Sequence, residues 1–467
     1  MQSHYKVYLV VFGLLALIVA PVVSNGYYEL SLAEQLAVNS PKLASLHYER
    51  AALRLPWRAD LWTQAGLSAY RSGNYDDAIR LFTSAQKRDA LSAAAWNLFG
   101  AAYWAKAEHA QALNIWQTGA QKNPAYAPLY DSLALAYHEN GDYASEQDTL
   151  TMRLSLQDDA RAHYRLALLL TLTDSTRALR EFTAASSLDP EFDSVSRTMV
   201  TALNISALQT DETTRLITLG RGFGLVEEWG LAQRVFEQAV GANGKNAEAW
   251  AWLGEAKQHN GQDGRAELDQ ALALDKQSVI VRALRGLYWK RQKQYKEALN
   301  EYRSASELEP ENPAWQVSIG EAYLQLGDLA SALASYQRAA ELAPNDATYW
   351  RLLAVFCAAN NVQVEEVGLP AAQRAQALAP DDPLVLDALG WSYLSSGRYT
   401  LAEQTLQKAL QHAPDLVSAH LHLGMTRLAQ NERASAYVEL SRARDLDPQS
   451  AEGQFAAGLL KQYFENP

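Results

Sequence analysis

The sequence predicts an all-α protein built from repeated helix pairs, preceded by an apolar segment at the amino terminus. Three observations lead to this fold class. Glycine and proline recur with a period of about 34 residues, small and aromatic residues keep the same phase between them, and one uninterrupted apolar run lies near the start. Self-similarity at this period indicates stacked supersecondary units, so the 467 residues are not expected to form separate compact domains.

The composition excludes several classes of protein. Hydrophobic residues make up 48% of the chain and charged residues 20%, which excludes an intrinsically disordered polymer. The net charge of -12 would repel a phosphate backbone, so no nucleic-acid partner is expected. The single cysteine, Cys357, cannot form an intramolecular disulfide or a cysteine metal cluster.

The apolar run covers residues 7–23 (VYLVVFGLLALIVAPVV) and is the one stretch of the sequence suited to a membrane. Its length leaves two interpretations open. Tyrosines on both sides favour a retained, single-pass transmembrane helix within residues 1–24. The small residues Val22 and Ser24, with Pro21 ending the apolar helix, favour a cleaved signal segment instead.

Charges around this run predict an orientation. Lys6 precedes the run, whereas Glu29 and Glu34 follow it. The positive-inside tendency then predicts a membrane-held body outside the cytoplasm, and the alternative is secretion after signal cleavage.

Two ladders of residues define the repeat. A proline follows each helix-like run, and a glycine recurs at a fixed offset from it, with an aromatic residue, a small residue and a second aromatic residue between them. The prolines are Pro56, Pro124, Pro190, Pro310, Pro344, Pro380, Pro414 and Pro448, and the glycines are Gly66, Gly100, Gly220, Gly254, Gly286, Gly320, Gly390, Gly424 and Gly458.

This pattern resembles the tetratricopeptide repeat, in which an aromatic residue, Leu-Gly, Tyr, Ala, Phe or Tyr, Ala and Pro mark two antiparallel helices. Residues 315–344 (WQVSIGEAYLQLGDLASALASYQRAAELAP) are an especially close copy. The resemblance implies a right-handed α-solenoid, or superhelix, of about twelve helix-turn-helix units. We place an amino-terminal array at 25–190, an inserted helix or hinge at 191–212, a second array at 213–450, and a capping helix and tail at 451–467.

Several repeats depart from the pattern, and we expect local distortion in them. Glu146 stands where the small residue belongs, the repeat at 159–190 lacks the glycine, the repeat at 247–278 is short, and the repeat at 347–382 carries an extra loop. The segment 191–212 has helical periodicity but no partner in the repeat phase.

No motif predicts catalysis, a cofactor or a metal ion. Gly220 to Gly224 resembles a phosphate-binding loop, but no strand precedes it, so a packing role is favoured. His420 and His422 would point in different directions from one helix, and Cys357 occupies a position that is normally buried. We therefore expect no enzyme, with a cryptic enzyme around residues 191–224 as a minor alternative.

The family resemblance implies that partners bind in the concave groove lined by the first helix of each repeat. The Lys and Asn typical of chaperone-tail clamps are missing from the corresponding positions. The groove residues that we predict to bind a partner are Tyr70, Asn97, Trp104, Asp131, His138, Arg221, Glu255, Glu321, Arg351, Asp387, Trp391 and Met425.

These features predict a membrane-tethered scaffold that binds partner proteins or peptides and organises an envelope or surface assembly. The alternative from another class is an accessory module in envelope polysaccharide or glycoconjugate handling, because Trp and Tyr can stack on sugars. An apolar groove that packs only against its own superhelix is the structural alternative to both.

Overall fold

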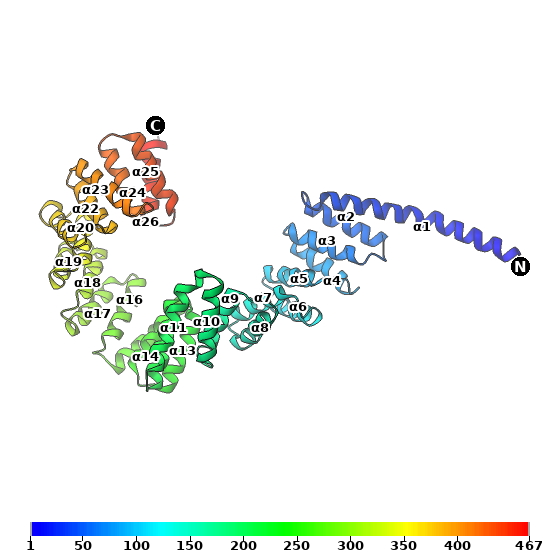
Figure 1. The fold of residues 1–467 in the computed structure, drawn as a ribbon, viewed down its shortest axis with the longest axis horizontal. Coiled ribbons are helices and arrows are strands. Elements are labelled where there is room, and N and C mark those ends of the chain that lie inside the picture. Colours follow the sequence, from blue (N-terminus) through cyan, green and yellow to red (C-terminus); the bar gives the residue numbers. More distant parts are fainter. Residues whose placement is uncertain (1, 466–467) are drawn as a thin grey trace. The chain divides into compact units, whose positions relative to one another are not determined.

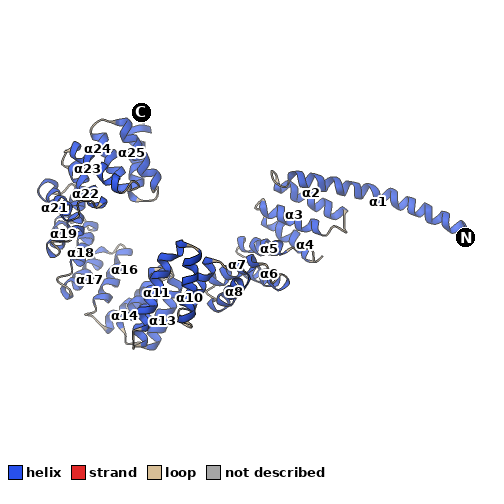
Figure 2. Ribbon diagram, viewed as in Figure 1, coloured by secondary structure: helices blue, strands red, loops and turns tan. Residues whose placement is uncertain are grey.

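A computed structural model of the chain describes the backbone of residues 2–465 and the side chains of residues 19–464. Over this range the chain is helical, with 26 α-helices and no strand, as the sequence predicts (Figure 1). Short turns join consecutive helices, and Figure 2 shows this alternation along the chain. The chain divides into two compact units. The first contains the residues up to Thr210 together with Gly222–Gly230, and the second contains Asp211–Arg221 together with the residues from Leu231 onward.

Five helix pairs and one additional helix build the first unit. The pairs are α1 (Gln2–Leu36) with α2 (Pro41–Arg54), α3 (Asp60–Arg71) with α4 (Tyr75–Gln86), α5 (Ala93–Ala105) with α6 (His109–Lys122), α7 (Ala127–Glu139) with α8 (Tyr143–Leu156), and α9 (Ala160–Leu170) with α10 (Ser175–Leu188). The short helix η1 (Pro190–Phe192) leads into the additional helix α11 (Asp193–Ala207).

The next pair, α12 (Glu212–Leu225) and α13 (Trp229–Ala242), contributes residues to both units. Six further helix pairs follow in the second unit. They are α14 (Ala247–His259) with α15 (Arg265–Leu274), α16 (Val279–Arg291) with α17 (Tyr295–Leu308), α18 (Pro313–Gln325) with α19 (Leu329–Leu342), α20 (Ala347–Asn360) with α21 (Leu369–Leu378), α22 (Pro383–Ser395) with α23 (Tyr399–His412), and α24 (Val417–Ala429) with α25 (Arg433–Leu446). The unit ends with α26 (Ala451–Leu460) and η3 (Lys461–Glu465).

The first helix continues through Pro21, which lies inside α1. The prediction that Pro21 ends a helix is therefore wrong. The carboxyl-terminal part of α1 packs against α2, where Leu30 and Ala33 are buried. No helix has a sufficiently long apolar stretch to cross a membrane within the residues whose side chains are described, and most of the predicted anchor at 7–23 lies outside those residues.

Close packing inside most pairs depends on the repeated glycine of the first helix. A Cβ atom added at Gly100 would lie 2.3 Å from the indole nitrogen of Trp116, and one added at Gly286 would lie 2.3 Å from the Tyr302 ring. Only a residue without a side chain allows the first helix to approach the bulky residue of the second so closely. The same relation joins Gly66 with Phe82, Gly220 with Phe236, Gly320 with Tyr336, Gly390 with Leu406 and Gly424 with Leu440.

Turns between the paired helices need a left-handed residue. Gly141 and Gly397 adopt φ values of 68° and 73°, as their glycine-containing turns predict. Ala107 and Lys293 occupy left-handed positions with φ values of 59° and 57°. Non-glycine residues in this region carry a steric cost, so these two turns are less favourable than the glycine turns.

Local departures from the repeat have two different outcomes. The extra loop of 347–382 forms a single π-helical turn, η2 (Val364–Gly368), with Asn361 and Gln363 in left-handed conformations just before it. This confirms the predicted distortion there. By contrast, α7 to α10 remain ordinary helices, because the unusual Glu146 is accommodated by a partner side chain, described below.

The glycines of α12 serve packing. A Cβ atom at Gly222 would lie 2.6 Å from the Cβ atom of Ala202 on α11, and one at Gly224 would lie 2.9 Å from the Trp229 ring. Gly222 thus permits the additional helix α11 to pack closely beside it. This confirms the structural interpretation of the glycine-rich segment.

Replacing Gly100 with Ala is expected to destabilise the first unit. Trp116 donates a hydrogen bond from Nε1 to the Asn97 carbonyl at 2.9 Å, so its ring cannot move away without losing that bond. Overpacking of this kind costs about 1–3 kcal/mol. Urea unfolding followed by circular dichroism, together with hydrogen exchange of α5 and α6, measures the effect.

The matched control is Gly458→Ala in α26. No atom lies within 4 Å of the added Cβ atom, so this change should leave stability unchanged or raise it, since Ala favours a helix over Gly by about 0.5–1 kcal/mol. Equal effects of the two substitutions would contradict the packing role assigned to Gly100.

Candidate functional site

An open cavity of about 870 Å³ lies in the first unit. Its walls come from α7, α8, the amino-terminal part of α9 and the η1 segment, and from the turn between α12 and α13. The lining residues are Asp131, Ser132, Ala134, Leu135, His138, Glu146, Leu150, Asp159, Ala160, Arg161, Ala162, Tyr164, Arg165, Asp189, Glu191, Phe192 and Glu228.

Arg165 lies at the centre of a buried polar network on this wall. Its Nε and Nη2 atoms donate to the two carboxylate oxygens of Glu146 at 2.5 and 3.1 Å, and its Nη1 atom donates to Glu228 at 2.7 Å. The Nδ1 atom of His138 lies 2.7 Å from Nη2. The Glu146 side chain is only 1% exposed and that of Arg165 13% exposed. Arg165 therefore joins α7, α8 and the α12–α13 turn through a single side chain.

The network determines the ionisation of Glu146. Burial by itself raises the pKa of the Glu146 carboxyl, but His138 and Arg165 outweigh it, so the pKa ends below its usual value of 4.5. Burial likewise disfavours the charged form of Arg165, yet the carboxylates of Glu146 and Glu228 raise its pKa. Both side chains are therefore ionised at neutral pH, and each needs the other in this buried position.

Carboxylates outnumber cations in the lining. Six carboxylates face two guanidinium groups, those of Arg161 and Arg165. Behind the wall, Arg153 pairs with Asp131 at 2.6 Å and lies 3.6 Å from Asp159, which raises the cations to three. The cavity thus keeps an excess of negative charge, and the exposed Glu191 carboxylate has no hydrogen-bond or ion-pair partner within the described residues.

Apolar surface accompanies these charges. Leu135 is 54% exposed on α7 and lines the cavity. The rings of Tyr164 and Phe192 lie 5.2 Å apart on the α9 and η1 side. An occupant can therefore bury apolar side chains and meet negative charge at the same place.

The cavity brings together two of the predicted groove residues. Asp131 and His138 both lie on its wall, with Leu135 between them on α7. Asp131 accepts from Arg153, and His138 contacts Arg165. Their role in partner binding stays a prediction.

The other predicted groove residues of the first unit contact neighbouring side chains. Asn97 accepts a hydrogen bond from Ser132 of the following repeat at 2.7 Å. The rings are equally engaged: Tyr70 lies 5.5 Å from Tyr75, and Trp104 lies 4.0 Å from His109 and 5.6 Å from Trp116.

Two acidic groove residues of the second unit are buried and paired with the next repeat. Glu255 accepts from Arg291 at 2.5 and 2.7 Å. Asp387 lies 2.7 Å from His422, whose ring stacks on Trp391 at 4.2 Å. These side chains connect the first helices of consecutive repeats. Their carboxylates are therefore less available to bind a partner.

The remaining predicted residues of this unit are more accessible. Arg221 lies 5.3 Å from the Trp252 ring, Glu321 accepts from Lys290 at 2.5 Å, and Met425 packs against the apolar cluster formed by α24, α25 and α26. Arg351 is half-buried and has no hydrogen-bond partner among the side chains that the structure describes.

Sequence reasoning missed Arg165, Glu228, Tyr164 and Phe192. Glu146 did give a signal, because an acid replaces the small residue that the repeat requires. Its partners could not be read from the chain, since Glu228 is 63 residues from Arg165 and reaches it only in the folded unit.

Other reactive side chains have structural surroundings. Cys357 is buried, and burial raises the pKa of its thiol to about 12, as expected for a core thiol. His420 contacts Glu439 and the Pro414 carbonyl, away from the Asp387 partner of His422. The described residues contain no group of three His, Cys, Asp or Glu side chains placed to hold a metal ion.

The repeated helix pairs define a helical-repeat protein. Residues 291–355 and 393–460 match a family model described as tetratricopeptide repeat, and residues 63–128 match a second model with the same description. The chain therefore contains tetratricopeptide repeats.

Three known proteins illustrate the similarity. A Bos taurus protein described as BBSome complex member BBS4 is 28% identical over 160 residues, which cover 33% of this chain and 30% of that protein. The chain thus spans less than a third of this relative. The crystal structure of yeast Tom70 covers 87% of this chain and 96% of its own, with 14% identity and a TM-score of 0.41. That of the APC/C hetero-tetramer Cut9-Hcn1 covers 95% and 97%, with 14% identity and a TM-score of 0.42.

Replacing Arg165 with Met is expected to lower the free energy of unfolding by about 3–5 kcal/mol, because Glu146 would keep a buried, unpaired charge. The double variant Glu146→Ala with Arg165→Met should recover most of that loss, since other repeats carry Ala at this position. Urea unfolding of the wild type, both single variants and the double variant measures the coupling. Additive effects would contradict a shared network.

The Glu146 pair also predicts a pH dependence. The pKa of the Glu146 carboxyl is lower in the folded protein than its value of about 4.5 in the unfolded chain. The ionised carboxylate therefore contributes its full stabilisation above about pH 4.5, and this contribution is lost as the pH falls through the lowered pKa. Unfolding of the wild type should therefore become easier below about pH 4.5. The double variant without Glu146 and Arg165 should lose less stability over the same range, and parallel curves would argue against the assignment.

Proposed function

We propose that this chain is a membrane-held tetratricopeptide-repeat scaffold that binds a segment of a partner protein in the cavity of its first unit. The carrying observation is the open cavity itself, whose wall combines exposed apolar surface with an excess of carboxylates. Tetratricopeptide-repeat proteins generally bind protein or peptide partners, and the repeats of this chain provide such a surface.

The charge of the lining indicates which side chains a partner segment should carry. Even with Arg153 included, three carboxylates remain without a matching cation, and the Glu191 carboxylate is free to accept. A partner segment with Lys or Arg side chains beside an apolar residue fits both the charge and the exposed Leu135. The buried pair of Glu146 and Arg165 holds α8 and α9 together, so the cavity is preformed and little conformational entropy is lost when a partner binds.

The membrane attachment rests on the sequence of residues 7–23, whose apolar character and flanking tyrosines suit a transmembrane anchor. Lys6 before the run, with acidic residues after it, supports a body outside the cytoplasm. A scaffold in this place would organise partners into an envelope or surface assembly.

Photo-crosslinking tests the binding site. A benzoylphenylalanine at Leu135 should crosslink to a partner in cells, whereas one at Met152, which is 47% exposed on α8 outside the lining, should not. Adding Glu191→Lys should reduce the Leu135 adducts several-fold, because it reverses a charge that faces the partner. The matched charge reversal Asp148→Lys, on exposed surface outside the lining, should leave them unchanged.

Mass spectrometry of the adduct identifies the bound segment. A segment that carries Lys or Arg supports the proposal. Equal crosslinking from Leu135 and Met152, or adducts that are insensitive to Glu191→Lys, would exclude the cavity as the binding site.

A further inference from the structure

Exposed apolar side chains gather at one end of the first helix pair. Val22, Tyr27 and Tyr28 of α1, and Leu53 and Trp57 at and after the end of α2, expose 48–66% of their surfaces. We call these five residues the end patch. The terminal repeat of an array normally presents a polar outer face, because no further repeat covers it. An apolar face at this place therefore needs an occupant.

Packing between the two helices brings the end patch together. The helices are antiparallel, and a Cβ atom added at Gly26 would lie 2.7 Å from the Leu55 side chain and 3.0 Å from Cβ of Arg54. The carboxyl-terminal end of α2 thus lies beside Gly26.

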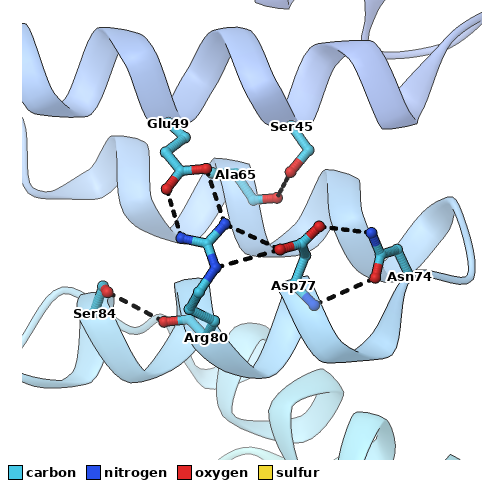
Figure 3. A network of polar contacts seen from close by, with 7 residues as sticks. All are labelled: Ser45, Glu49, Ala65, Asn74, Asp77, Arg80 and Ser84. Carbon is cyan, nitrogen blue, oxygen red and sulfur yellow. Dashed lines mark hydrogen bonds and ion pairs between the residues drawn. The ribbon is translucent and has the colours of Figure 1, made fainter.

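The charges beside the end patch are mainly cationic. Arg50 is exposed on α2, and its guanidinium has no partner within the described residues. Figure 3 shows that Glu49, the acid of α2, is held by Arg80 of α4, with contacts of 2.5 and 2.9 Å. Glu29 of α1 is buried beside His47, and its other oxygen lies 3.8 Å from Arg54. The carboxylates of Glu29 and Glu49 are therefore neutralised, and the exposed Glu34 lies further along α1, six residues beyond Tyr28.

The end patch also lies next to the most apolar segment of the chain. On a helix that rises about 1.5 Å per residue, Gly26 lies about 4.5 Å beyond Val23, where the apolar run ends. Because the end of α2 packs beside Gly26, Leu53 and Trp57 lie near the same height along α1. Aromatic side chains with arginines are the residues that membrane–water interfaces favour.

We propose that the end patch lies in the headgroup region of an anionic lipid bilayer, so that the first repeat docks on the membrane surface beside the anchor. This inference rests on the proposed membrane attachment through residues 7–23. Trp57, Tyr27 and Tyr28 would place their rings at the interface, and the unpaired Arg50 would contact lipid phosphates. Docking would fix the orientation of the first repeat relative to the bilayer, which a flexible tether would leave free.

Charge favours lipid over a second copy of this chain as the occupant. Two copies of this chain would bring two net charges of -12 together, which disfavours their association. Lipid phosphates supply that negative charge along with an apolar layer directly beneath.

Site-directed spin labelling of the full chain in lipid vesicles tests the inference. A label on Leu53→Cys should be shielded several-fold from a water-soluble nickel relaxation agent in vesicles that contain phosphatidylglycerol. Labels on Leu43→Cys, near the start of α2, and on Val438→Cys, in α25, are the controls and should stay accessible, since these sites are equally exposed but lie outside the end patch. The buried Cys357 should not react, and the unmodified chain verifies this.

Charge dependence provides a second measurement. Arg50→Gln should reduce the preference of the Leu53 site for phosphatidylglycerol over phosphatidylcholine by about fivefold, the equivalent of about 1 kcal/mol per basic residue at an anionic surface. The substitution removes an unpaired side chain, so folding should be unaffected.

The outcomes separate the docking from the attachment. A chain that does not remain with the vesicles contradicts the attachment and the docking together. A chain that remains with them, but whose Leu53 label is as accessible as the Leu43 and Val438 labels, overturns the docking alone. Dipolar broadening between Leu53 labels that disappears when labelled chains are diluted with unlabelled ones identifies a second copy as the occupant, and also overturns it.

Discussion

Stacking of the repeats requires the two helices of a pair to approach each other closely. A glycine of the first helix meets a large side chain of the second, and a Cβ atom at Gly100 or Gly286 would already overlap the opposing ring. Because most pairs meet this requirement in nearly the same way, successive pairs stack with a similar register. The first helices of neighbouring repeats then lie side by side, and their side chains form the surface from which the candidate site is built.

Polar residues on that surface serve two purposes that the repeat pattern does not separate. Some connect consecutive first helices, as Asn97 does with Ser132 and Asp387 with His422. Their hydrogen-bonding capacity is largely used inside the array. At the cavity of α7 and α9 the balance differs, because the lining holds more carboxylates than nearby cations. A partner can recognise the carboxylates that are not neutralised by cations within the array.

Glu146 shows how a departure from the repeat becomes a feature of the site. An acid in place of a small residue would be unfavourable in a buried position without a cation. Arg165 supplies the cation and also reaches Glu228, so one substitution is balanced by residues from two other segments. The result is an ordinary pair of helices with a charged wall, where the pattern alone indicated distortion.

The repeat can be recognised in the sequence alone, because the glycine, alanine, aromatic and proline positions reflect local packing between residues close in the chain. The sequence therefore predicted the all-α class, the repeated helix pairs and the distortion near Gly368. It also pointed to Asp131 and His138, which share a helix face. The three-dimensional packing alone determines which groove residues pair with each other, that Arg165 balances Glu146, and that the end of α2 lies beside Gly26. These relations join residues from different helices, and their distances depend on packing between helices that no local pattern encodes.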